Sequence, residues 1–272
     1  MESESLIALA ETNNLPKFQF MDETTHRWIL QNNPEHSTDD KLPNVQAHVS
    51  WLCKQSIPRE WFLEPCLIDS IHGLRHLYRT AYFCLLLIGN MQHSDIYTKC
   101  ATIAGLLHDI RRLEDKEDKF HAARTADWFR QHLTEITSHF NLTLTAENIA
   151  SIETAIALHE IPYEEFTQQQ ISQYQEHTML VDLLKTADAL DRYRLPKLKW
   201  WINDRYLHLT PSHAVKQIAY NITALSEGNF LRMNNSQESV LCAIRHLQLR
   251  HDPFNSDWHN THIFYGTYSR GL

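Results

Sequence analysis

The sequence predicts an all-α protein, for three reasons. The 272 residues include only six glycines and nine prolines, which is too few for the many turns of a β architecture. From residue 66 onward, hydrophobic residues recur at intervals of three and four, the spacing of amphipathic helices. No stretch shows the alternation that is typical of strands. Because 43% of the residues are hydrophobic, a chain of this length can also bury a sizeable core.

The first 65 residues predict an extension rather than a compact domain. Five prolines interrupt them, and the charged stretch 35–41 is typical of a solvated loop. Short helices are expected near residue 28 and over 45–55. We therefore divide the chain into three parts: an N-terminal extension packing on the core (1–65), a core (66–195), and a C-terminal helical extension of the same domain (196–272).

The core opens with a predicted helix over 66–88. Its hydrophobic residues repeat at helical spacing, and Gly89-Asn90 is typical of a C-terminal cap. Ser94 or Asp95 is expected to cap a second helix that extends to Ile110. The charged residues 111–119 break the helical pattern and predict a loop.

Five further helices are expected, each bounded by a cap or a break in the pattern. They cover 120–140; Thr145–His159, with Glu147 placed favourably for the helix dipole; 178–194, ending before Pro196; 210–226, opened by Thr210-Pro211; and 236–249. Residues 168–175 are polar and are predicted to form a loop, and residues 250–272 are expected to be irregular.

Charge and cysteine content exclude several classes of function. The 25 basic and 33 acidic residues give a net charge of −8, which argues against long nucleic acid as a partner. Five cysteines without a CxxC pair argue against a disulfide scaffold and a cysteine zinc site. The acidic N-terminus does not have the pattern of a secretory signal, and the apolar run 81–89 is too short to cross a bilayer. We therefore expect a cytoplasmic protein with no membrane partner.

Histidine and aspartate at predicted helix positions indicate a metal site. There are 18 histidines. His108 and Asp109 are neighbours at a helix end, where both side chains can turn toward one ion. His76 and Asp188 lie on other predicted helices, and helical bundles build metal sites in this way. Imidazole and carboxylate groups with an open coordination position would suit a divalent metal that activates water.

In their order and local context these residues resemble the H…HD…D signature of the HD superfamily of metal-dependent phosphohydrolases. HLYRTA around His76 is similar to H-x-x-R-V-A, LLHDIRR around His108 and Asp109 to LLHDIGR, and TADALDRYR around Asp188 to ADALD-R. The resemblance covers about residues 66–195 and implies an HD-domain helical bundle. One departure is Arg111, which replaces the usual glycine and would put a bulky cation near the site entrance.

Two further histidines determine how many metal ions the resemblance implies. His121 lies in a phrase similar to one that follows HD in many hydrolases of the superfamily, and AIALHE around His159 is similar to A-I-x-x-H. The resulting four histidines and two aspartates resemble the bimetal sites of HD-GYP phosphodiesterases and of HD-type mixed-valent di-iron oxygenases. Alternatively, His121 and His159 contact substrate or support a one-metal site. The resemblance leaves open one or two divalent ions, and manganese, iron, nickel, magnesium or zinc.

Four polar residues near the motifs are candidates for substrate binding: His72, Arg112, Lys185 and Arg192. Arginine offers a forked donor to phosphate, and lysine offers a point charge. On a continuous helix His72 and His76 would share a face, but His72 could instead cap the helix start or face solvent. Arg79 is expected to brace Asp191 or a backbone carbonyl.

The resemblance implies a phosphohydrolase in which His108 and Asp109 are catalytic and a metal-bound hydroxide attacks phosphorus. The expected substrate is a nucleotide or another small phosphate ester. Whether a phosphomonoester, a phosphodiester or a pyrophosphate bond is cleaved stays open. Two alternatives are an HD-type di-iron oxygenase and a non-catalytic HD module that binds a nucleotide or a partner protein. A homo-oligomer is a further option, because the two extensions could form an interface.

Overall fold

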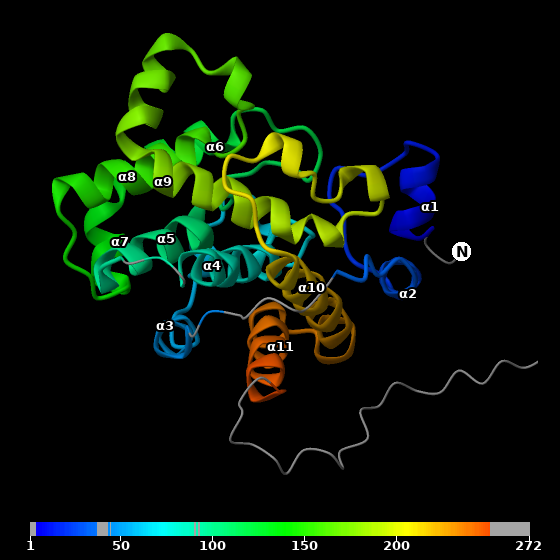
Figure 1. Ribbon diagram of the computed structural model, residues 1–272. Coiled ribbons are helices and arrows are strands. Elements are labelled where there is room, and N and C mark those ends of the chain that lie inside the picture. Colours follow the sequence, from blue (N-terminus) through cyan, green and yellow to red (C-terminus); the bar gives the residue numbers. More distant parts are fainter. Residues whose placement is uncertain (1–3, 37–42, 44, 90, 92, 251–272) are drawn as a thin grey trace, which may run out of the picture.

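The computed structural model describes residues 4–36, 43, 45–89, 91 and 93–250, and all regular structure in these ranges is helical (Figure 1). The α-helices are α1 Leu6–Glu11, α2 Glu23–Gln31, α3 Gln46–Leu52, α4 Leu74–Ile88, α5 Asp95–Leu107, α6 His121–Gln131, α7 Leu133–His139, α8 Ala146–Leu158, α9 Gln168–Leu190, α10 His213–Met233 and α11 Ser236–Arg250. The 3-10 helices are η1 Arg59–Trp61, η2 Pro65–Leu67, η3 Tyr163–Glu165, η4 Asp191–Arg194, η5 Leu198–Trp200 and η6 Asp204–Tyr206. The predicted all-α class is confirmed. Among the described helices, none is both apolar enough and long enough to reach across a bilayer.

Helix α4 lies in the middle of the bundle and is buried along its whole length. All 15 of its residues are buried, as expected of a helix that neighbours enclose on every side. Helices α5 and α9 pack against it, and so do α10 and α11 (Figure 1). Helix α8 contacts both α5 and α9, and α6 contacts α8. The helices that carry the predicted metal-binding residues are therefore neighbours in space.

The crossing of α5 over α4 depends on a glycine. A Cβ atom placed on Gly105 would lie 2.7 Å from the Cα atom of Ala81 and 2.8 Å from its backbone nitrogen. Only a residue without a side chain allows the two helix backbones to approach so closely. The close crossing brings the end of α5, where His108 lies, toward α4.

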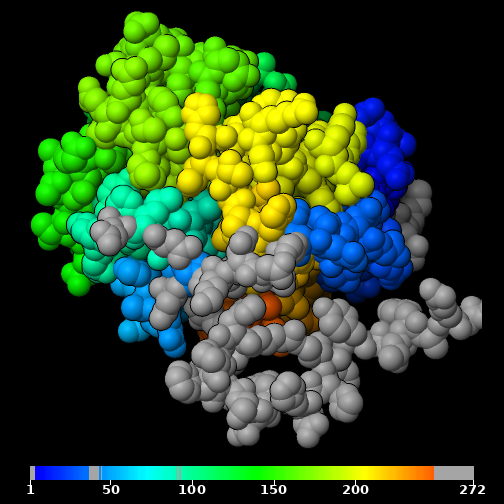
Figure 2. All heavy atoms as spheres, in the orientation of Figure 1, coloured from blue at the N-terminus to red at the C-terminus, as the bar shows by residue number. Residues whose placement is uncertain are grey.

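The described segments before and after this core pack on it. Helix α3 contacts α4 and α5, and α2 contacts α10. The N-terminal segment also pairs with backbone near the metal motifs: the Asp115 N–H donates to the Lys17 carbonyl at 2.9 Å, and the Ile71 N–H donates to the Gln19 carbonyl at 2.9 Å. In the space-filling view, the yellow residues after α9 lie between the green helices and the blue N-terminal segment (Figure 2).

The first core helix begins later than predicted, at Leu74 instead of residue 66. The backbone folds back before it: the Leu74 N–H donates to the Ile68 carbonyl at 2.8 Å. A Cβ atom on Gly73 would meet the carbonyl oxygens of Leu67 and Ile68 at 2.2 Å. Because this tight turn interrupts the helix, His72 precedes α4 and does not share a helical face with His76.

Other boundaries differ for local reasons. The expected helix over 120–140 divides into α6 and α7 at His132, whose Nδ1 lies 2.9 Å from the Trp128 carbonyl oxygen. The predicted loop 168–175 is helical, because Thr167 and Gln170 form a capping box that opens α9. Ser212, rather than Thr210, caps α10. Ser94 and Thr145 cap α5 and α8 as predicted, whereas nearly all of the predicted irregular segment 250–272 lies outside the described residues.

Candidate metal centre

Five helices bring the predicted metal-binding residues together. His76 lies within α4, His108 is the C-cap of α5 with Asp109 directly after it, and His121 is the first residue of α6. His159 is the C-cap of α8, and Asp188 lies in the last turn of α9. All but His76 therefore lie at or beside a helix end, where the chain turns and side chains can converge. All are buried except Asp188, whose side chain is 29% exposed.

One group of potential ligands comprises His76, His108 and Asp109, with Asp188 beside them. The Nε2 atoms of His76 and His108 are 2.9 Å apart. From the Nε2 atom of His76, a carboxylate oxygen of Asp109 is 3.5 Å away and one of Asp188 is 3.3 Å away. Two imidazoles and two carboxylates within this distance are typical of a divalent metal site.

A second group comprises Asp109, His121 and His159, so Asp109 belongs to both groups. Its Oδ1 atom lies 2.9 Å from the Nε2 atom of His121 and 3.3 Å from that of His159. Its Oδ2 atom faces His76. Asp109 therefore stands between two sets of nitrogen donors, as a carboxylate shared by two ions would.

All four imidazole rings have the orientation that metal ligands require. Each Nδ1 atom lies within hydrogen-bonding distance of an oxygen acceptor: His76 at 2.7 Å from Asp191, His108 at 2.9 Å from the Gly105 carbonyl, His121 at 2.9 Å from Glu160, and His159 at 2.7 Å from the Ile156 carbonyl. Such acceptors favour a proton on Nδ1 and leave Nε2 to bind a metal.

A buried oxygen at the centre supports the same conclusion. Among the described residues, Asp109 Oδ1 is buried and accepts no hydrogen bond of ordinary geometry, although the Nε2 atoms of His121 and His159 lie 2.9 and 3.3 Å away. Leaving a buried carboxylate oxygen unsatisfied is costly. A cation among these nitrogens and oxygens would remove that cost, so the residues that are present fit a metal ion.

The electrostatics of the two groups differ. Burial lowers the pKa of His108 to about 3, so this ring is neutral and ready to bind a metal. Burial alone would also lower the pKa of His121, but the Asp109 and Glu160 carboxylates raise it to about 9. Burial opposes the ionised form of Asp109, yet Arg112 and His121 hold its pKa well below the usual value. Without metal, a proton on His121 provides the positive charge between two carboxylates.

Two of the four predicted substrate-binding residues lie beside the centre with their side chains engaged. Arg112 Nη1 donates to Asp109 Oδ2 at 3.3 Å, while its other nitrogens donate to the carbonyls of Glu114 and Lys116. The Nδ1 atom of His72 lies 2.9 Å from Asp115. Burial, together with the nearby Arg112, holds the pKa of His72 well below its usual value, so the ring is neutral.

The other two predicted substrate-binding residues, both near the end of α9, differ from each other. The Lys185 Nζ donates to the carbonyls of His159 and Ile161 at 3.0 and 2.6 Å. Burial lowers its pKa to about 8. Arg192 is exposed on η4 between buried neighbours, so the structure leaves it on the surface. Arg111, expected near the entrance, instead donates to the Trp61 carbonyl and lies over the Trp128 ring.

Three acidic residues contribute more than the sequence indicated. Asp191 contacts both His76 and Arg79, which confirms the expected Arg79–Asp191 contact. Glu160 directly follows His159, and an acidic residue beside a ligand is a signal that could have been read. Asp115 stands in the charged run 111–119 that predicted a loop, but it is only 5% exposed, and nothing local in that run indicates burial.

The described residues therefore contain two overlapping groups that could hold metal ions. Their fit rests on converging Nε2 atoms, a shared carboxylate and hydrogen-bonded Nδ1 atoms. Comparisons of the chain with protein-family models, with curated proteins and with solved structures gave no match.

Proposed function

We propose that this chain is a metal-dependent phosphohydrolase of the HD type that acts on a nucleotide or another small phosphate ester. The observation that carries the proposal is the convergence of six side chains in the order of the HD signature: His76, His108, Asp109, His121, His159 and Asp188. The fit of this donor set to one or two divalent ions supports a hydrolytic centre.

The residues of the chain have distinct tasks in this proposal. The imidazoles and carboxylates hold divalent metal, which when bound would polarise a phosphoryl oxygen and lower the pKa of a water molecule. Asp109, whose two oxygens face the two groups of nitrogen donors, orients the attacking water beside the metal. Arg112, which contacts Oδ2 of Asp109, keeps that carboxylate ionised and in place.

Substrate approaches from the side of Asp188. Its side chain is 29% exposed, whereas the side chains of His76 and Asp109 are 0% and 3% exposed. Lys185 lies one helical turn before Asp188 on α9, so its ammonium group is near this opening. The net charge of −8 supports a small phosphate ester over long nucleic acid.

The test is phosphate release from a panel of nucleotides and small phosphate esters, after loading with manganese, iron, nickel, magnesium or zinc. We expect turnover that Asp109→Ala lowers at least about 1000-fold, because the variant lacks the shared ligand and the group that orients water. Asp127→Ala, at an exposed position of α6, is the matched control and should keep wild-type turnover. Equal turnover by Asp109→Ala and Asp127→Ala would contradict the proposal.

The shared carboxylate also favours a second candidate, an HD-type di-iron oxygenase. Asp109 lies between two histidine groups, an arrangement that would suit two irons. Two irons per chain with oxygen-dependent turnover, and no phosphate release with any metal, would favour the oxygenase. Metal binding without turnover of any kind would favour a non-catalytic HD module.

A further inference from the structure

A buried network of ion pairs connects the metal centre to the C-terminal part of the protein. Beyond His76 stands Asp191, whose Oδ2 atom lies 2.7 Å from the Nδ1 atom of His76. Its Oδ1 atom accepts from the Nε–H of Arg79 at 2.5 Å. Arg79 in turn donates from Nη1 to Glu227 Oε1 at 2.6 Å. The side chains of all four residues are 0% exposed, so water cannot replace any of these contacts.

Helix α10 supplies two contacts to this ionic network. Glu227 lies on α10 and binds Arg79, as described above. One turn earlier on the same helix, the Thr223 hydroxyl donates directly to Asp191 Oδ1 at 3.3 Å. Arg194 completes the arrangement, because it donates from Nη1 to the Asp191 backbone carbonyl at 2.9 Å and from Nε to the Ile71 carbonyl at 2.7 Å. Donors from α4, α10 and η4 therefore restrain Asp191.

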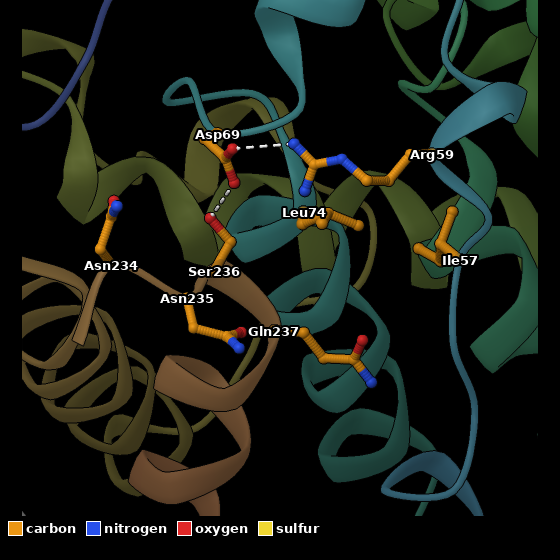
Figure 3. Close-up of a pocket in the computed structure, with 8 residues that line it drawn as sticks. All are labelled: Ile57, Arg59, Asp69, Leu74, Asn234, Asn235, Ser236 and Gln237. Atoms are coloured by element: carbon orange, nitrogen blue, oxygen red, sulfur yellow. Dashed lines mark hydrogen bonds and ion pairs between the residues drawn. The ribbon is translucent and has the colours of Figure 1, made fainter.

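The end of this ionic network that is distant from the metal centre lies beside a surface pocket. Glu227 Oε2 accepts from Arg75 at 2.8 Å. Arg75 also donates to the Ser236 hydroxyl at 3.0 Å and to the Asp69 carbonyl at 3.1 Å, and its guanidinium lies over the Phe230 ring. Figure 3 shows Ser236 and Asp69 in the wall of that pocket, with Asp69 between Ser236 and Arg59. Arg75 therefore has support that does not depend on Ser236.

Stability alone is a poor explanation for these buried charges. Removing ionised groups from water is expensive, and apolar side chains of similar volume often stabilise a core as well or better. A metal-binding histidine, in contrast, requires an acceptor at its second nitrogen, and such acceptors commonly change metal affinity about 10- to 100-fold. Of the four residues from His76 to Glu227 in this network, His76 is the potential metal ligand: its Nδ1 atom meets Asp191, and its Nε2 atom faces His108 and Asp188.

We infer that Asp191 is a positioning residue for the metal ligand His76, and that α10, through Thr223 and Glu227, holds Asp191 in place. The inference rests on the proposed function only in requiring that the centre binds metal. It makes α10, which lies outside the segment that resembles the HD superfamily, part of the support of the metal centre.

The test measures Co²⁺ binding to the full chain by calorimetry, with visible and EPR spectra of the bound ion. Asp191→Asn should weaken the affinity of the ion bound by His76 about 10- to 100-fold and change its spectra. Thr223→Ala should change both in the same direction and to a smaller extent, and Thr223→Ser should restore them. Ser236→Ala is the matched control, because it removes a hydroxyl from the end of the same ionic network that is distant from the metal centre. It should lower thermal stability without changing Co²⁺ affinity.

The outcomes separate this inference from the proposed function. Wild-type affinity and spectra in Thr223→Ala and in a folded Asp191→Asn would overturn the inference alone. So would a loss of affinity in Ser236→Ala as large as that in Thr223→Ala, because the effect would then follow stability. If Asp191→Asn does not fold, the Thr223 variants decide. A wild-type chain that binds neither Co²⁺ nor any of the five candidate metals would overturn the proposed function together with the inference.

Discussion

Gly105 and Ala81 hold α5 and α4 at backbone contact: a Cβ atom on Gly105 would lie 2.7 Å from the Cα atom of Ala81. The same glycine provides the carbonyl that lies 2.9 Å from the Nδ1 atom of His108. One residue therefore sets both the distance between two ligand-bearing helices and the orientation of one ligand.

Gly105→Ala should separate α5 from α4 and disturb the contact between His108 and His76. We expect a loss of about 1–3 kcal/mol in the free energy of unfolding, as is usual for overpacking, and weaker metal binding. Urea unfolding and metal content by plasma mass spectrometry measure the two effects. Ala104→Gly weakens the same helix without a clash and should leave metal content unchanged. An equal loss of metal in both variants would show that the close crossing has no specific role.

His121→Ala and Asp109→Ala should differ in the number of metal ions that each retains. His121 belongs to one potential ligand group, whereas Asp109 belongs to both. We expect wild-type protein to bind two ions per chain, His121→Ala one, and Asp109→Ala none tightly. Equilibrium dialysis followed by plasma mass spectrometry gives these ratios. A wild-type ratio of one that His121→Ala leaves unchanged would place His121 outside the metal site.

Glu160→Gln should weaken the binding of the ion held by His121 and His159 and leave the binding of the other ion unaffected. Glu160 Oε2 lies 2.9 Å from the Nδ1 atom of His121, and its Oε1 accepts from the Ala122 N–H at 3.3 Å. The amide keeps the size of the side chain but removes the charge that makes the imidazole a better ligand, so we expect a loss of about 10- to 100-fold. Calorimetric titration resolves the two binding events. Glu164→Gln, at an exposed position, should bind both ions as the wild type does.

The buried Asp115 carboxyl should make the free energy of unfolding depend on pH. Burial raises its pKa from 3.8 to about 6, so between these values the folded protein binds more protons at this site than the unfolded chain does. The contribution to stability is therefore present below about pH 4 and is lost as the pH rises through 6. Two units of pKa correspond to about 3 kcal/mol at most.

Urea unfolding of wild-type protein and Asp115→Asn from pH 4 to 7 tests this prediction. The stability of the wild type relative to the variant should fall with rising pH, while the contributions of titratable groups that do not contact Asp115 cancel in the difference. A difference that is constant or that rises with pH would contradict the expected shift. The slope is the relevant quantity, since the amide also changes the bonds that Asp115 makes to Gln19 and Ser70.

Much of the fold was predictable from local patterns. The caps at Ser94 and Thr145 and the helical spacing of hydrophobic residues identified α5 and α8. The same reasoning failed where a tertiary contact or a second cap competes with the pattern. Gly73 packs on the carbonyls of Leu67 and Ile68 and delays the start of α4. The capping box of Thr167 makes a polar segment helical.

Periodicity and motif order along the chain were enough to predict the all-α class and to identify the six residues that converge. The position of Asp109 between two histidine groups and the burial of Asp115 depend on the packing of the helices. The same is true of Glu227, which lies far along the sequence and supports Arg79 and through it Asp191. Burial and contact depend on how helices cross, and the crossing of α4 and α5 depends on side-chain volume at Gly105 and Ala81. No local pattern encodes such a distance between helices.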